Sequence, residues 1–177
     1  MPRLRRRLTT SLLLVLALAA SPTFAAADVI PIPGVRVAGG PLWNITEGEV
    51  FGTLDVLPNI EFIDLQDGVA FNFLLGYGYE GSGDHLFQAG LDVGLYSTEN
   101  IVSPSLGFRG VIGSVDDDLG GGLRVVAGTG VWFGVFRCEA AYQLLSRHDG
   151  VTHDLRIVAG LDVVRLVVAP FLIAFSN

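Results

Sequence analysis

The sequence predicts an all-β protein, built as a single antiparallel up-and-down barrel of about eight strands. Large apolar residues alternate with small or polar residues over most of the chain, as in strands whose two faces meet different surroundings. Segments rich in Gly, Asp, Ser and Asn separate these runs at intervals of roughly 10–14 residues, which is typical of tight turns. Glycine, which disfavours helices, accounts for 23 of the 177 residues.

The first 27 residues are predicted to be a cleaved secretory signal peptide. Four arginines precede Thr10, the apolar run SLLLVLALAA covers Ser11–Ala20, and small residues lead up to Ala27. An apolar run of this length is too short to cross a bilayer as a helix. The mature chain, residues 28–177, has the length of one domain.

Nine runs of the mature chain are strand candidates. In chain order they are Gly34–Trp43, Glu49–Ile63, Gly68–Gly81, Asp84–Tyr96, Asn100–Gly113, Gly122–Phe133, Phe136–Leu145, Val151–Asp162 and Arg165–Phe175. The third, GVAFNFLLGYGYEG, is the most regular, with Leu74 the one large residue on its small or polar parity. The first is weaker because Arg36 lies inside it, and the last is apolar at both parities.

The charged residues inside these runs all fall on the parity that holds small and polar residues. The opposite parity is almost free of charge, with His153 as its main polar exception. One face of the sheet is therefore hydrocarbon, and the other carries glycines, amides and charges of both signs. The residues predicted to share this charged face are Arg36, Asp55, Glu61, Asp92, Arg109, Arg124, Arg137, Glu139, Arg156 and Asp162.

Alternation alone fits two kinds of barrel. A soluble lipocalin-like barrel would turn the apolar face inward to bind an apolar ligand, whereas a membrane barrel would turn it toward lipid. Glycine on the charged parity suits a narrow interior, which favours the membrane barrel. Aromatic residues near the predicted strand ends also favour it, because such residues form girdles at membrane interfaces. They are Trp43, Tyr77, Tyr79, Tyr96, Trp132 and Phe133.

Turn character gives a third indication. The turns EGSGD, SVDDDLGG and SRHDG are polar and acidic, while STEN and the turns near Gly134 and Val164 look tighter. Bacterial outer-membrane barrels have short periplasmic turns and longer external loops.

From about Gly34 to Phe175 the chain resembles the small outer-membrane β-barrel families typified by the OmpA transmembrane region and OmpX. The resemblance is carried by DVLPNIEFIDLQDGVAFNFLLGYGY, LFQAGLDVGLY and FRCEAAYQLL. It implies eight strands, passage through the periplasm with chaperones, and insertion into outer-membrane lipid by the barrel assembly machinery. Single-chain bacterial barrels have even numbers of strands, so one of the nine candidates is not expected to be a barrel strand.

An eight-stranded barrel is just wide enough for side chains to fill it. The interior arginines and acids are then expected to pair, since unpaired buried charge is costly. This predicts a salt-bridged plug, with a narrow ion or solute path as the alternative.

Other chemistry is sparse. Removing the signal peptide leaves seven arginines, no lysine and 18 acidic residues, a net charge of −11 that argues against nucleic-acid binding. The single cysteine, Cys138, excludes an internal disulfide. An outer-membrane hydrolase could use His148–Asp149 or His153–Asp154, and the acidic run 116–118 could hold Ca²⁺, but both lack the spacing of dedicated sites. We therefore expect a monomeric, non-enzymatic protein with no catalytic residue, cofactor or metal.

Overall fold

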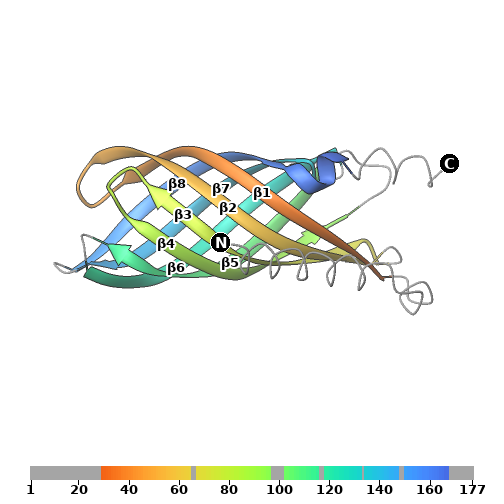
Figure 1. The fold of residues 1–177 in the computed structure, drawn as a ribbon, viewed down its shortest axis with the longest axis horizontal. Coiled ribbons are helices and arrows are strands. Elements are labelled where there is room, and N and C mark those ends of the chain that lie inside the picture. The colour runs from red at the N-terminus through yellow and green to blue at the C-terminus, as the bar shows by residue number, and fades with distance from the viewer. Residues whose placement is uncertain are drawn as a thin grey trace, which may run out of the picture.

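The computed structural model describes residues 29–64, 67–96, 102–115, 118–132, 134–147 and 150–167. Eight antiparallel strands form a closed barrel, in which consecutive strands pair and β1 pairs with β8 (Figure 1). The predicted all-β, up-and-down barrel of eight strands is confirmed. The strands are β1 (Val29–Asn44), β2 (Glu49–Asp64), β3 (Val69–Glu80), β4 (His85–Leu95), β5 (Val102–Val115), β6 (Asp118–Val131), β7 (Phe136–Arg147) and β8 (Gly150–Asp162). The predicted signal peptide, residues 1–27, lies outside the described residues.

The weak candidate Gly34–Trp43 proves to be part of a full strand, and the surplus candidate is the last one. Residues 163–167 form a short helix that includes the first three residues of the candidate Arg165–Phe175. Residues 168–175 lie outside the described part of the chain. The backbone N–H of Arg165 donates to Asp162 Oδ1 at 3.0 Å. A carboxylate in this position caps a helix N-terminus, so the chain changes from strand to helix where Asp162 ends β8.

The strands are strongly staggered around the barrel. When paired residues are followed once around from Ile32, through Glu61, Asn72, Asp92, Gly107, Val126, Ala141 and Arg156, the path returns to β1 at Leu42. The shear number is therefore 10, the difference between positions 32 and 42. For eight strands this corresponds to a tilt of about 40° from the barrel axis.

We call the two ends of the barrel the hairpin end and the terminal end. The hairpin end carries the connections 45–48, 81–84, 116–117 and 148–149, and the terminal end carries Val29, the connections 65–68, 96–101 and 132–135, and the helix 163–167. The sequence indicated tighter turns at STEN (97–100) and near Gly134 and Val164. The connections 96–101 and 132–135 are not shorter than the connections at the hairpin end, and residues 163–167 form a helix rather than a turn between two strands. That prediction was wrong because the strands extend into the polar segments and leave only two to four residues for each hairpin connection.

Among the described residues, the first half of β1 has no strand partner on its β8 side. β1 pairs with β2 along its whole length, but with β8 only from Arg36 onward. The N–H of Val35, which points toward β8, donates to Asp162 Oδ1 at 3.2 Å. Residues 31 and 33 share this direction, because alternate residues of a strand point their N–H groups to the same side, and both are prolines with no N–H to leave unpaired. The edge is therefore protected against pairing with another strand.

The apolar face of the sheet points outward and the charged face points inward. Phe71, Phe73 and Phe108 are 43%, 53% and 69% exposed, whereas Arg109 and Arg124 are fully buried. Leu74, the exception in its run, is buried inside the barrel. Among the described residues, no helix is long and apolar enough to span a bilayer.

Candidate functional site

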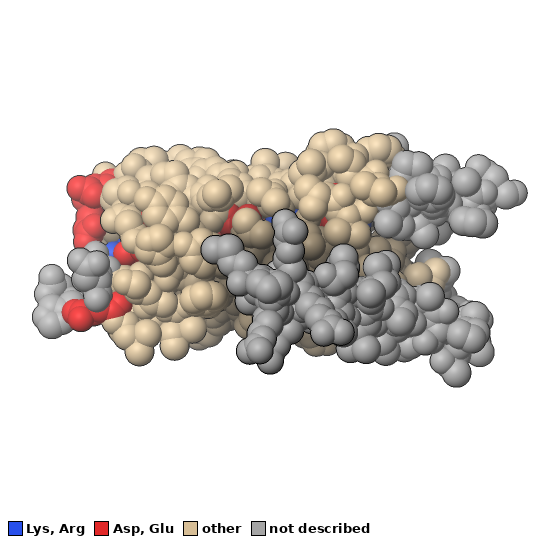
Figure 2. All heavy atoms as spheres, viewed as in Figure 1, with Lys and Arg blue, Asp and Glu red and all other residues tan. Residues whose placement is uncertain are grey.

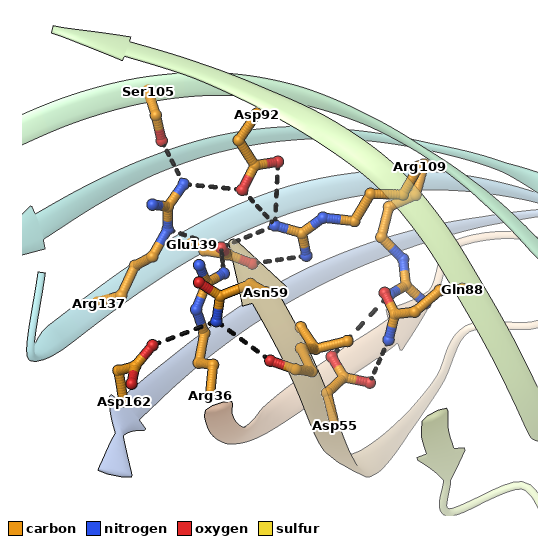
Figure 3. Close-up of polar contacts among 12 residues, drawn as sticks. Arg36, Asp55, Asn59, Gln88, Asp92, Ser105, Arg109, Arg137, Glu139 and Asp162 are labelled. Carbon is orange, nitrogen blue, oxygen red and sulfur yellow. Dashed lines mark hydrogen bonds and ion pairs between the residues drawn. The ribbon is translucent and has the colours of Figure 1, made fainter. Parts of the chain in front are cut away.

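The ten charged residues predicted to share one face all point into the barrel. Nine of them are buried, and the side chain of Glu61, near the terminal end, is 12% exposed. They are joined by ion pairs and hydrogen bonds into connected groups (Figure 3). Because the strands are staggered, each group combines side chains from several strands.

The Glu139 cluster comprises Arg36, Asp92, Arg109, Arg137 and Glu139. The carboxylate of Glu139 accepts hydrogen bonds from Arg36 at 2.5 Å, Arg109 at 2.8 Å and Arg137 at 2.9 Å. Asp92 accepts from Arg109 at 3.1 Å and Arg137 at 3.0 Å. Two carboxylates thus hold three guanidiniums, and the Arg137 guanidinium also donates to the hydroxyl of Ser105.

The Asp55 cluster lies closer to the hairpin end and comprises Asp55, Glu80, Gln88, Arg124, Gln143, Asp154 and Arg156. Asp55 accepts from Arg156 at 2.9 Å and from Gln88 at 3.0 Å. Arg124 donates to Gln88 and Gln143 and lies 3.4 Å from Glu80. Gln143 in turn donates to Glu80 and Asp154. The two glutamines relay hydrogen bonds between charged groups, while Asp154 Oδ1 and Arg156 Nε and Nη1 have no hydrogen-bond partner among the described residues.

A third group lies at the terminal end. Arg165, from the short helix, pairs with Glu61 at 2.5 Å and donates to Asn59 at 3.3 Å. Asn59 donates to Asp162 at 3.2 Å. Arg165 therefore ties the helix back into the barrel.

Glycines on the neighbouring strands make room for the charged side chains. Asp55, Asp92 and Glu139 are paired with Gly78, Gly107 and Gly128, and Arg109 and Arg137 are paired with Gly90 and Gly130. A Cβ atom on Gly90 would lie 2.7 Å from Arg109 Cγ, and one on Gly128 would lie 3.3 Å from Glu139 Cγ. Side chains opposite them thus explain Gly78, Gly107 and Gly128, whereas a Cβ atom on Gly90 would first meet the backbone oxygen of Phe108 and one on Gly130 the backbone of Gly134.

The interior at the hairpin end is apolar. Leu86, Val111, Val115 and Leu145 form a buried cluster, which we call the apolar seal. Beside it Arg147 and Asp84 pair at 2.7 Å. The four side chains of the seal themselves carry no hydrogen-bonding group.

A pocket opens at the terminal end, and its lining includes Asn72, Asp92, Tyr96 and Arg137. Burial, together with the nearby Glu61 carboxylate, raises the pKa of Tyr96 above its usual value. Glu139, behind Asp92 and Arg137, lies beyond the pocket, which therefore does not lead through the barrel.

Sequence reasoning missed several members of these groups. Glu80, Gln88, Gln143 and Asp154 lie on the charged parity and are buried in the Asp55 cluster. Parity was a sufficient signal for their orientation, but not for their partners, since Gln143 and Glu80 are 63 positions apart. Arg165 gave no such signal because it follows the strand-to-helix change.

The outer wall carries aromatic side chains near both ends. Tyr77, Tyr79 and Tyr142 lie toward the hairpin end with His85 and His153, and Tyr142 and His153 are 2.5 Å apart between the hydroxyl and Nδ1. At the terminal end Trp132 stacks on Phe136. Of the residues predicted for the girdles, Tyr96 instead lines the interior pocket, and Phe133 lies outside the described residues.

Two candidate sites from the sequence can be placed in part. His153 points outward while Asp154 points inward to Gln143, so these neighbours do not form a His–acid pair. His148–Asp149 and residues 116–117 of the acidic run lie outside the described residues, and Asp118 is exposed at the start of β6. Within the described ranges no group of His, Cys, Asp and Glu side chains could hold a metal ion.

Comparisons with protein-family models, with curated proteins and with solved structures find no match to this chain.

Proposed function

We propose that this chain is an integral outer-membrane β-barrel protein of structural or surface-interaction type, without catalytic activity. The observation that carries the proposal is the apolar outer wall. Large side chains such as Phe73, Leu75 and Phe108 are each more than half exposed and follow one another around the barrel. A contiguous apolar surface of this size is unfavourable in water and favourable against acyl chains.

The distribution of cations supports the same proposal. The seven arginines from Arg36 onward all lie in the interior or at its mouth, and none of their side chains is more than 9% exposed. In Figure 2 the side wall, where grey atoms do not cover it, is mostly tan with a few acidic and basic atoms near its middle, and acidic residues gather at the hairpin end on the left. A wall without charge can face hydrocarbon along its whole height.

Strand length is also adequate. The shortest strand, β4, has 11 residues. At about 3.3 Å per residue and about 40° of tilt it rises about 28 Å, compared with an apolar band of about 25 Å in outer-membrane barrels.

The soluble alternative required Phe71, Phe73, Leu91 and Val93 to line an apolar interior, with the arginines outside. Phe71, Phe73 and Val93 are exposed, and charged groups occupy the interior where an apolar ligand would have to bind. The ion path is disfavoured by the apolar seal and the closed Glu139 cluster. The connections at the hairpin end are only two to four residues long. This favours a structural role over a role in which long loops bind a partner.

In the proposed setting the signal peptide directs export, and the protein reaches outer-membrane lipid through periplasmic chaperones and the barrel assembly machinery as a monomer. Insertion from the periplasm would leave the terminal end there, since only the four short hairpin connections then have to cross the bilayer. The small outer-membrane barrels typified by the OmpA transmembrane region and OmpX remain the class that it resembles.

Membrane fractionation combined with gel migration tests the proposal. We expect the protein in the outer-membrane fraction, extractable only with detergent, and migrating differently before and after boiling, because a closed hydrogen-bonded barrel resists detergent. Boiled protein from the same preparation is the matched control for the unfolded position. Recovery in the soluble fraction without detergent would contradict the proposal.

A further inference from the structure

The seam between β1 and β8, where the barrel closes, is its shortest strand pairing. β1 pairs with β8 at residues 36–39 and 42–44, with a break at residues 40–41. All other pairings of neighbouring strands are longer. At the terminal end the seam therefore consists of residues 36–39 of β1 and residues 159–162 of β8, and the break separates this part from the rest.

Beyond these residues, toward the terminal end, side chains take the place of strand pairing. Asp162, the last residue of β8, accepts hydrogen bonds from the N–H of Val35 and from Asn59 Nδ2, each at 3.2 Å. Arg165, from the helix 163–167, pairs with Glu61 at 2.5 Å and donates to Asn59 at 3.3 Å. Asn59 and Glu61 belong to β2, so these contacts reach past β1 and join the end of β8 to the second strand.

The same contacts form one side of the mouth. Among the described residues, the lining of the pocket at the terminal end comes from β2 to β7, the connections next to them and Arg165. β1 and β8 lie between β7 and β2 in the closed barrel. Arg165 thus closes the sector in which these two strands contribute nothing to the lining. If Arg165 moved away, the mouth would open sideways over the first half of β1.

We propose that Asn59, Glu61, Asp162 and Arg165 form a clasp that holds the seam shut at the terminal end, and that release of the Arg165–Glu61 pair opens the mouth sideways between β8 and β1. This pair is the releasable part, because the Glu61 side chain is 12% exposed and water can replace Arg165 there, whereas Asp162 is 3% exposed. The clasp goes beyond the structural role proposed above and does not depend on membrane location, since all its contacts lie within the barrel.

Hydrogen exchange of backbone amides, measured by NMR on the full-length folded protein in detergent micelles, tests the clasp. The N–H groups of Gly39 and Ala159 point into the seam, because alternate residues of a strand point their N–H groups to the same side and Val35 and Asp162 fix that direction. Exchange at these two positions therefore reports local opening of the seam.

Glu61→Gln keeps the shape of the side chain and removes its charge. We expect Gly39 and Ala159 to exchange at least about tenfold faster in this variant, because the clasp loses its ion pair. Phe73 and Leu91, which are paired on β3 and β4, should change by less than about twofold.

Arg165→Gln breaks the same pair from its other side and serves if Glu61→Gln does not fold. It should accelerate exchange of Gly39 and Ala159 at least as much, and the double variant should not exceed it, because both changes remove one interaction. The matched control is Arg147→Gln, which breaks a pair with Asp84 at the hairpin end. It should affect Gly39 and Ala159 no more than it affects Phe73 and Leu91.

A disulfide across the seam separates its opening from a general loss of stability. Residues 37 and 161 are directly paired, so Val37→Cys and Leu161→Cys, in a Cys138→Ala background, suit a disulfide. With this bond formed, Glu61→Gln should no longer accelerate exchange of Gly39 and Ala159. Unchanged exchange in both Glu61→Gln and Arg165→Gln, equal acceleration at Phe73 and Leu91, or acceleration that persists with the disulfide would each overturn the proposal.

Discussion

The two ends of the barrel interior are closed in different ways. At the hairpin end, Leu86, Val111, Val115 and Leu145 pack against one another and leave no polar atom facing inward among them. At the terminal end, ion pairs of Arg137 and Arg165 border a pocket whose lining includes Asn72, a buried asparagine without a side-chain hydrogen bond to any described residue. The same parity of the same strands thus forms an apolar seal at one end and a polar mouth at the other.

This difference separates two roles of the interior. A seal of apolar side chains requires only that the space be filled, whereas the mouth depends on the pairing of each charge. The apolar end is therefore expected to tolerate changes of shape, and the polar end to be sensitive to the loss of a single partner. Variants along the barrel can test this contrast.

The largest effect is expected for Glu139→Ala, at the floor of the polar end. Glu139 is the only group bound to Arg36 among the described residues and is also bound to Arg109 and Arg137. Its removal leaves buried positive charge uncompensated, which costs about 3–5 kcal/mol. The free energy of unfolding in urea, followed by the fluorescence of the tryptophans in lipid vesicles, measures this loss.

Glu47→Ala is the control for that measurement. Glu47 is exposed in a hairpin connection and bonds only locally to Asn44. Its replacement should cost no more than about 1 kcal/mol. Comparable losses for the two glutamates would mean that the interior pairing does not stabilise the barrel.

A smaller loss is expected from Leu145→Ala in the apolar seal. Leu145 is fully buried, and its truncation leaves a cavity that costs about 2–5 kcal/mol, depending on how far the neighbours relax. The matched change is Leu144→Ala, one residue away on the outer wall, where the leucine is 37% exposed. Lipid can fill the space left there, so the same urea titration should give a smaller loss. A loss for Leu144→Ala as large as that for Leu145→Ala would contradict the proposed orientation of the two faces.

Gly107→Ala tests whether the polar end is as tightly packed as its glycines indicate. A Cβ atom at Gly107 would clash with the carboxylate of Asp92 and disturb its bonds to Arg109 and Arg137. Overpacking of this kind costs about 1–3 kcal/mol.

Gly52→Ala is the control, because nothing lies within 4 Å of a Cβ atom built there. It should leave the unfolding midpoint nearly unchanged. Equal stability of both alanine variants would show that Asp92 has room to move.

The sequence alone predicted much of this arrangement. Period-two alternation identified which residues face inward, because orientation in a strand depends only on parity. It could not identify partners, since Arg36 and Glu139 meet across 103 positions only when eight strands close with a shear number of 10.

The apolar seal was missed although a signal was present. Consecutive large apolar residues interrupt the alternation at Val111–Ile112 and at Leu144–Leu145, and the inward member of each pair belongs to the seal. Asn72 could not be recognised in advance. Whether an asparagine has a partner depends on packing, and nearby Asn59 on the same face is fully engaged.

The smallest change in stability is expected at the edge of β1 that has no strand partner among the described residues, which belongs to the terminal end alone. Replacing Pro31 and Pro33 together with valine would restore two N–H groups that point away from β2, toward the side on which β8 has already ended. The folded barrel should lose or gain no more than about 1 kcal/mol, because neither proline donates a hydrogen bond. The oligomeric state should respond more strongly, since an unprotected edge pairs with a second copy. Sedimentation velocity in detergent should then show dimers that the unmodified protein and Pro58→Val, in a strand paired on both sides, do not form. A double variant that stays monomeric would assign the protection of this edge to Asp162 and the helix 163–167.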